Sequence, residues 1–387
     1  MNSLMLPRER VHKALSFQEP DRVPVAIGGG PYGIVDELYF RLLHHLNLGA
    51  PVPPFRQGHN ISYMDDRLLK LLGTDLRYVY PTLSPGSPIH PSGDSETMRD
   101  AFGQIWRRAF PYYYVEKGIL AGINRIDQID ETIRWPEPKD ARWFSGLPER
   151  TKELREGTDF WVVARMITSH GPYQMACDLR GTEQFMLDLV VNPDLATAIL
   201  SRIGDSLCGF LEYYLLACGQ WIDMIELPGD DYAGNENLII SPKMFRQFIQ
   251  PVLQRMVATV RSINPDIKIM LHSDGAIEKL IPDLIMIGID VVHPLEPLPV
   301  TEQSLIKRTY KYQISFLGGI DISHAMPGSV EDVREEVIRC IQELAQGGGY
   351  ILAPSNHLQS DVAPENVVAL VQFAHQYGSY PLRIEQK

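Results

Sequence analysis

His272 and Asp274 stand two positions apart at the end of an apolar stretch, KIMLHSDG, that begins at Lys268. In an extended strand, positions two apart share a face, so the imidazole and the carboxylate point the same way, while Gly275 lets the chain turn into a helix. This pair of side chains can bind a divalent metal ion or transfer a proton. The alternative is a polar strand end that caps the following helix.

The elements that must position this pair alternate along the chain. Short apolar, β-branched runs are separated by longer helical patterns from the third run onward, which predicts a parallel sheet. Eight such units match a (β/α)8 TIM barrel, an α/β fold, and a doubly wound open sheet is the second choice. The predicted strands are 22–28, 76–81, 160–167, 223–229, 267–273, 290–296, 314–320 and 350–356.

Other acidic, imidazole and amide groups also occur where predicted strands end. Because barrel enzymes place their chemistry at the carboxyl ends of the strands, these groups should surround one pocket. We therefore predict a reaction centre of His272 and Asp274 with Glu226 and Asp230 in or beside it. Several aromatic side chains near the mouth could pack against a ring, and the predicted substrate-binding residues are Tyr32, Tyr173, Tyr232 and Asn356.

An interruption separates the second and third predicted strands. Residues 82–96 are rich in Pro, Ser and Gly and read as a loop, and residues 100–119 have the composition of an extended hairpin. We expect one barrel domain over 1–387 with an insertion at about 82–120 that could cover the mouth. A surface hairpin without a role fits this segment equally well.

Composition excludes several classes of protein. The 387 residues carry a net charge of -12 and no basic cluster, which does not suit nucleic acid. No apolar run could span a bilayer, so we expect a cytoplasmic protein with no membrane partner. The four cysteines are scattered without a C-x-x-C pair, which indicates neither a disulfide framework nor a thiolate zinc knuckle.

Several longer stretches resemble the uroporphyrinogen decarboxylase superfamily. They are ERVHKALSFQEPDRVPV, GPYQMACDLRGTEQFMLDLV, GDDYAGNENLIISPKMFRQFIQPVLQRM, LHSDG and GGGYILAPSNHLQSDVAPENV. The resemblance covers nearly the whole chain, implies the barrel fold, and is nearer to the corrinoid-dependent methyltransferases than to the decarboxylases. The decarboxylases carry an R-Q-A-G-R-Y-like stretch after the first strand, whereas this chain has AIGGGPYGIVDE at 26–37. Without those arginines the many carboxylates of uroporphyrinogen lose their main contacts.

The resemblance also bears on a metal. Members that serve thiol acceptors have a zinc site built from H-x-C on the fifth strand and a second cysteine after the eighth. His272 matches the histidine, while Asp274 and Asn356 stand at the two cysteine positions. We therefore expect nitrogen and oxygen ligands or no metal, with zinc as a candidate. The expected ligands are His272, Asp274, Glu296 and His357.

Oxygen ligands suit the polarisation of an ether oxygen better than the activation of a thiol. The chain therefore resembles the substrate-side methyltransferase of anaerobic O-demethylase systems. That resemblance implies a methoxylated aromatic donor and a cobalamin-type corrinoid carried by a separate corrinoid protein. A methylcorrinoid-to-tetrahydrofolate methyltransferase, a decarboxylase with another arginine clamp and a non-catalytic scaffold stay open, as does a homodimer.

Overall fold

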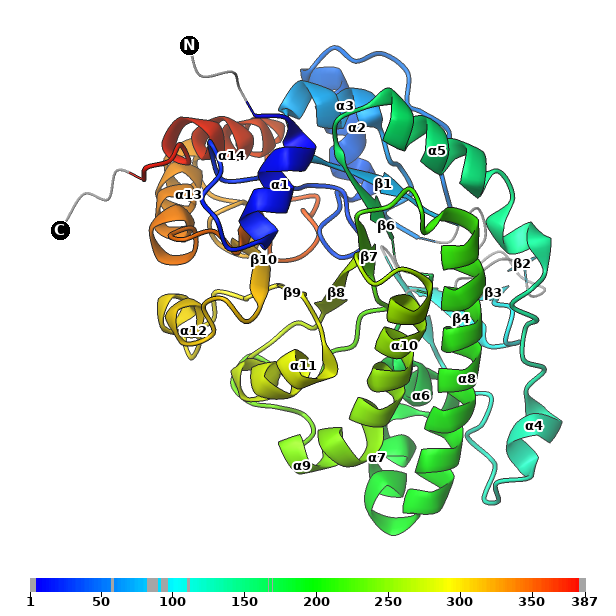
Figure 1. The fold of residues 1–387 in the computed structure, drawn as a ribbon. Helices are drawn as coiled ribbons and strands as arrows, with labels where there is room; N and C mark the ends of the chain where they lie inside the picture. The colour runs from blue at the N-terminus through cyan, green and yellow to red at the C-terminus, as the bar shows by residue number, and fades with distance from the viewer. Residues whose placement is uncertain are drawn as a thin grey trace.

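The computed structural model describes residues 5–56, 59–81, 90–91, 97–109, 112–165, 167–168 and 170–382. A seven-stranded, all-parallel sheet curls through the centre of the molecule (Figure 1). Its strands, in spatial order, are β1 (Leu76–Val79), β6 (Trp161–Ala164), β7 (Met224–Glu226), β8 (Lys268–His272), β9 (Val291–His293), β10 (Ser315–Ile320) and β11 (Tyr350–Pro354). Each of these seven lies within a predicted strand.

Helices surround the sheet and connect its strands (Figure 1). In the part of the chain that the structure describes, no helix is long and apolar enough to cross a membrane. The α-helices are α1 (Pro7–Leu15), α2 (Asp36–His45), α3 (Asp66–Leu72), α4 (Gln128–Thr132), α5 (Leu147–Gly157), α6 (Pro172–Arg180), α7 (Thr182–Val191), α8 (Pro193–Cys218), α9 (Pro242–Met244), α10 (Gln250–Ile263), α11 (Ile281–Ile287), α12 (Gln303–Thr309), α13 (Val330–Leu344) and α14 (Pro364–Tyr377). Two 3-10 helices, η1 (Ala141–Phe144) and η3 (Glu278–Leu280), and one π-helix, η2 (Phe245–Ile249), complete the helical elements of the described residues.

The prediction of a strand at 22–28 is wrong. This segment forms only single bridges, one of them parallel between Val25 and Leu352 of β11. Pro24 has no N–H to donate, and the glycines at 28–30 favour other backbone conformations, so a regular ladder cannot form. The segment nevertheless links the two edges of the sheet, because Ala26 donates to Leu352 and Asp75, just before β1, donates to Val25. The result is a curled sheet consistent with a TIM-like barrel closed by an irregular segment.

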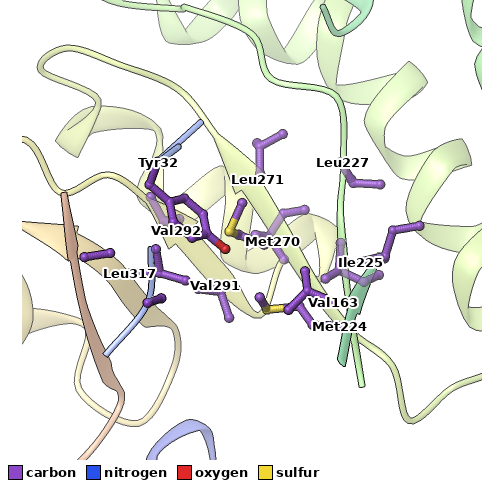
Figure 2. Close-up of a cluster of buried hydrophobic side chains, with 14 of the residues drawn as sticks. Tyr32, Val163, Met224, Ile225, Leu227, Met270, Leu271, Val291, Val292 and Leu317 are labelled. Atoms are coloured by element: carbon purple, nitrogen blue, oxygen red, sulfur yellow. The ribbon is translucent and has the colours of Figure 1, made fainter. Parts of the chain in front are cut away.

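The interior of the curl is an apolar core (Figure 2). The strands read as continuous runs without polar alternation because they are buried on both faces. Figure 2 shows a cluster of buried apolar side chains on five neighbouring strands, with Tyr32 among them: Val163, Met224, Ile225, Met270, Leu271, Val291, Val292 and Leu317, all at most 1% exposed. Successive residues of a strand point to opposite faces, so the cluster fills the interior of the curl and also packs against the surrounding helices. This packed floor closes the interior and leaves only the carboxyl ends of the strands for a site.

A second sheet lies between β1 and β6 in the chain. Its four antiparallel strands are β2 (His90–Pro91), β3 (Thr97–Arg99), β4 (Ile105–Ala109) and β5 (Tyr112–Val115). The pair β4 and β5 falls within the stretch expected to be an extended hairpin. Most of the expected loop at 82–96 lies outside the described residues.

Candidate active site

Two histidines meet at the carboxyl ends of neighbouring strands. His272 ends β8, His293 ends β9, and the two residues are paired in register, so their side chains lie on the same side of the sheet. Their Nδ1 atoms are 2.9 Å apart. One of these two nitrogens must therefore carry a proton and the other must accept it.

The surroundings of His293 decide which nitrogen is the donor. Its Nε2 lies 3.1 Å from the carbonyl oxygen of Pro354, which can only accept, so His293 Nε2 carries a proton. Burial lowers the pKa of His293 well below its usual value, so the ring is neutral and its Nδ1 is an acceptor. His272 must then donate from Nδ1. A neutral His272 consequently presents a free lone pair at Nε2.

Two carboxylates lie near this lone pair. His272 Nε2 is 3.7 Å from Asp274 Oδ1 and 3.9 Å from Asp231 Oδ1, too far for hydrogen bonds. In a tetrahedral zinc site with bonds of about 2.0–2.2 Å, neighbouring donor atoms lie roughly 3.4 Å apart, so a small contraction would bring these three groups onto one cation. Asp231, His272 and Asp274 form the group of potential metal ligands found among the described residues.

Asp274 shows the strongest sign of a missing partner. Its Oδ1 is buried and has no hydrogen-bond partner in the described part of the chain, whereas its Oδ2 accepts a 2.5 Å hydrogen bond from Asn356 Nδ2. Burial raises the pKa of Asp274 to about 6. A buried, unsatisfied carboxylate oxygen is costly unless a cation or a proton meets it. Together with the lone pair of His272, this oxygen fits a divalent metal ion.

Two glycines make this arrangement sterically feasible. A Cβ on Gly229, just after β7, would lie 2.6 Å from the His272 ring, so only glycine lets the imidazole occupy its place. Gly275 has a φ of +86°, and a Cβ there would lie 2.5 Å from the carbonyl oxygen of Ala233. The turn that follows Asp274 therefore also requires glycine.

The three potential ligands lie at the edge of a cavity of about 480 Å³. Aromatic side chains, imidazoles and one guanidinium make up half of the remaining lining residues. The lining residues are Gly30, Pro31, Arg56, His59, Asn60, Ile61, Trp106, Tyr112, Tyr113, His170, Gln174, Gly229, Asp231, His272, Asp274, Asn356 and His357. A hollow of this size, with converging polar groups, has the properties of a small-molecule site.

The sequence profile of the uroporphyrinogen decarboxylase (URO-D) family matches residues 151–377, which is more than half of the chain. The chain belongs to the URO-D family. It is 25% identical over 232 residues to two sequences described as the methylcobamide:CoM methyltransferase MtaA, from Methanosarcina barkeri and its strain Fusaro. Each match covers 59% of this chain and 62% of the relative, so the chain spans less than two thirds of the relatives' length.

A solved methyltransferase from Methanosarcina mazei has a similar fold. Its TM-score is 0.64 at 21% identity, and the match covers 96% of this chain and 99% of the other. At 21% identity this similarity shows only that the two proteins share a fold. The resemblance to the superfamily recognised in the sequence is thus confirmed, and the named relatives are methyltransferases.

The URO-D family chain brings four predicted site residues to the cavity: His272, Asp274, Asn356 and His357. Asn356 holds Asp274 from the position where the thiol-serving members carry a cysteine. His357 accepts a hydrogen bond from Gly33 N at Nδ1, 3.2 Å away, so the neutral ring keeps Nε2–H as a donor. Glu296, predicted as a metal ligand, instead accepts from the backbone N–H of Gly275, and neither it nor His357 is in the three-residue cluster.

Glu226 and Tyr32 lie beneath the cavity and do not line it. The Glu226 carboxylate is fully buried and accepts hydrogen bonds from Tyr32 Oη, at 2.8 Å, and Gly30 N, at 2.7 Å. Burial raises the pKa of Glu226. The pair fixes the glycine-rich segment that forms one part of the cavity wall.

Asp230, Tyr173 and Tyr232 are also buried and away from the cavity surface. Asp230 accepts from the backbone N–H groups of Tyr173 and Gln174, in the first turn of α6, and from the hydroxyl of Tyr232. Its carboxylate thus caps α6 in place of an ordinary N-cap side chain, since Gly171 has none. Burial raises the pKa of Asp230 to about 7.

Asp230 and its neighbour Asp231 should separate stability from metal binding. The change Asp230→Ala leaves three buried donors without an acceptor and should lower the free energy of unfolding by about 2–4 kcal/mol. Asp231→Ala, at a half-exposed side chain, should change it by less than about 0.5 kcal/mol. Urea unfolding in the presence of a chelator measures the free energy of unfolding of each variant. Equal losses from the two variants would contradict this division.

Several cavity residues were not predicted. Asp231 follows the fourth predicted strand and is not among the predicted site residues, because side-chain direction cannot be read from sequence once a strand has ended. Arg56 and His59 come from an irregular segment that offers no strand-end signal. His170 lies in the loop before α6, where its Nδ1 is 2.5 Å from Asp178 Oδ2. A loop histidine that precedes a helix carrying an acid is too common in proteins for the sequence to indicate a site.

Proposed function

We propose that this URO-D family protein is a corrinoid-dependent methyltransferase acting on an aryl methyl ether. The methyl–oxygen bond of a methoxylated aromatic breaks, the methyl group passes to the Co(I) corrinoid of a separate protein, and an aryloxide leaves. The observation that carries the proposal is the position of His272 Nε2, 3.7 Å from Asp274 Oδ1, which has no hydrogen-bond partner among the described residues. The similarity to methylcobamide methyltransferases supports the use of a corrinoid.

The donor set supports an oxygen-bound rather than a sulfur-bound methyl group. In the members of the superfamily that serve thiol acceptors, and that this chain resembles, the zinc site has two cysteine ligands. None of the four cysteines of this chain lines the cavity. Burial also raises the pKa of Cys177, on neighbouring α6, to about 12, so it stays a thiol. Nitrogen and oxygen donors leave a divalent cation more Lewis-acidic.

The residues of this chain divide the work. A divalent cation such as zinc, when held by Asp231, His272 and Asp274, supplies Lewis acidity toward the ether oxygen. Asn356 orients the Asp274 carboxylate, and His293 fixes the tautomer of His272. His357 keeps Nε2–H available to donate to the departing aryloxide oxygen.

The aromatic wall supports a ring-shaped substrate. Trp106, Tyr112 and Tyr113 line the cavity from the second sheet, whereas the metal-ligand candidates come from the ends of the parallel strands. Such side chains can pack against a phenyl ring while the wall excludes water. Holding the methyl carbon in line for attack contributes much of the rate in a transfer of this kind.

The metal should bind without sulfur. We expect purified protein to hold up to about one divalent ion per chain, with nitrogen and oxygen ligands only, because no cysteine can reach the cluster. Elemental analysis gives the stoichiometry, and X-ray absorption at the metal edge gives the ligand atoms. A sulfur scatterer in the first coordination sphere would contradict the expectation.

The reaction itself is tested with a reduced corrinoid protein and a methoxyarene such as veratrole or guaiacol. Methyl-Co(III) formation, followed by absorbance, should depend on the added protein. The named relatives favour a second candidate, transfer from a methylated corrinoid to an acceptor. If no methoxyarene methylates the corrinoid, but a methylated corrinoid loses its methyl group to tetrahydrofolate or coenzyme M, the second candidate takes its place.

A further inference from the structure

Two arginines lie near one aromatic ring, that of Phe55, which precedes the cavity-lining Arg56 in the chain. The guanidinium carbons of Arg56 and Arg165 lie 5.1 and 4.8 Å from the centre of the Phe55 ring, so they are at most about 10 Å apart. Arg56 lines the cavity, and Arg165 is buried beside it. Two cations are thus held close together at one part of the site.

Neither arginine has a carboxylate partner among the residues that the structure describes. Arg56 donates from Nε to the carbonyl oxygen of Ile61, at 2.7 Å, and its two terminal amino groups form no hydrogen bond with described residues. Arg165 donates from Nη2 to the carbonyl oxygens of Gly29 and Gly30, and its buried Nε has no partner. Arg165 is buried, and buried guanidinium groups in proteins are normally paired, whereas Arg56 is half-buried and lines the cavity.

The two described acids that interact electrostatically with these arginines accept hydrogen bonds from other groups. Asp36, the acid that interacts with Arg56, accepts from the backbone N–H and hydroxyl of Ser62. Glu226, which interacts with Arg165, accepts from Tyr32 and Gly30. Neither carboxylate forms an ion pair with its arginine. Glu226 therefore offsets the charge of Arg165 only in part, and Asp36 likewise offsets the charge of Arg56 only in part.

The local electrostatics agree with an uncompensated positive charge. Burial, and then the charge of Arg165, lower the pKa of Arg56. Burial and the arginine charges likewise lower the pKa values of His59 and His357, which keeps both imidazoles neutral. Neutral imidazoles add hydrogen-bonding capacity without adding repulsion between cations. A bound anion would offset the repulsion between the two arginine charges and would accept hydrogen bonds from donors that are already in place.

The cavity therefore has two unlike regions. Asp231, His272 and Asp274 form an acidic, metal-binding region, and Arg56 with Arg165 forms a cationic one. His357 lies within electrostatic reach of both, since Arg56 and His272 each lower its pKa after burial. A ligand that satisfies both regions must carry a methoxy group at one position and an anionic group at another.

We propose that Arg56, supported by Arg165, binds the carboxylate of a methoxylated aromatic acid. This inference rests on the proposed function, because it names the substrate class of the same site. The planar guanidinium of Arg56 has two terminal amino groups that form no hydrogen bond with a described residue, which suits bidentate recognition of a carboxylate. The ring of the acid then lies along the aromatic wall, with its methoxy oxygen toward Asp274 and His272.

The binding test uses ligands without a transferable methyl group, so it does not depend on turnover. The probes are 4-hydroxybenzoate, the matching neutral 4-hydroxybenzamide and inorganic phosphate, titrated by calorimetry into the wild-type protein. We expect the acid to bind about 10- to 100-fold more tightly than the amide, the range of one charge-assisted contact. Equal affinity for acid and amide, or phosphate binding as tight as that of the acid, would overturn the proposal.

Variants assign the preference to Arg56. Arg56→Gln should reduce the affinity for the acid about 10- to 100-fold and leave that for the amide nearly unchanged, while Arg56→Lys should retain part of the preference. The matched control is Arg125→Gln, at an exposed arginine paired with Asp127. Circular dichroism checks that each variant is folded. An unchanged acid-to-amide ratio in folded Arg56→Gln contradicts the assignment.

Turnover separates this inference from the proposed function. Methyl transfer from 4-hydroxy-3-methoxybenzoate is compared with transfer from its amide. Transfer from both at equal efficiency would uphold the methyltransferase and reject the anion site. Binding of the acid through Arg56 without transfer from any methoxyarene would uphold the anion site and reject the proposed reaction.

Discussion

Replacement of His272 by alanine should lower the rate of methyl transfer by about 1,000-fold or more while the protein stays folded. The imidazole supplies the free lone pair at the reaction centre, and groups in this position contribute roughly 10²–10⁴ in rate. Its side chain lies at the cavity edge, 12% exposed, so truncation enlarges the cavity and leaves the apolar core beneath it in place. The measurement is the initial rate of methyl-corrinoid formation, alongside thermal unfolding.

A matched histidine serves as the control for this experiment. His324 is exposed and lies 3.0 Å from Asp321, outside the cavity lining. His324→Ala should keep close to the wild-type rate. If His272→Ala retained wild-type turnover, or if His324→Ala lost as much, the reaction centre would have to be sought elsewhere.

The change Asp274→Asn should have the second-largest effect. It removes the negative charge and one ligand oxygen but keeps the size of the side chain, so folding should be nearly unaffected. Loss of a ligand from a three-residue cluster should weaken metal binding by at least about 100-fold and lower turnover with it. Metal affinity is measured by competition with a chromophoric chelator, and activity by the corrinoid assay.

An acid outside the cavity provides the comparison. Asp321 follows β10, as Asp274 follows β8, but it caps the turn at Ser323 and His324. Asp321→Asn should leave metal affinity unchanged. Undiminished metal binding in Asp274→Asn would show that the unpartnered oxygen is not a ligand.

The alternation of strands and helices was readable from the sequence because buried parallel strands are short, continuous apolar runs. It located His272 and Asp274 at strand ends, and the structure places both at one cavity. Strand 22–28 looked equally apolar, but Pro24 and the following glycines prevented a regular ladder.

Asp230 and Asp231 show a different difficulty for prediction from sequence. Both follow β7, and the backbone turns between them decide that one carboxylate faces α6 and the other the cavity. The conformation of that turn cannot be predicted from the sequence. Arg56 was equally hidden, because it becomes significant only when Phe55 and Arg165 are seen beside it.

The cavity draws Arg56 and its aromatic wall from a different part of the chain than its potential metal ligands. The potential metal ligands lie at 231–274, inside the stretch that matches the URO-D family profile, whereas Arg56 and the aromatic wall lie within 56–113, before it. A mutation in the earlier part can alter which molecule is accepted without moving the reacting groups. Selectivity and reactivity can therefore diversify independently, which makes residues 56–113 the natural target for libraries that seek new methyl donors.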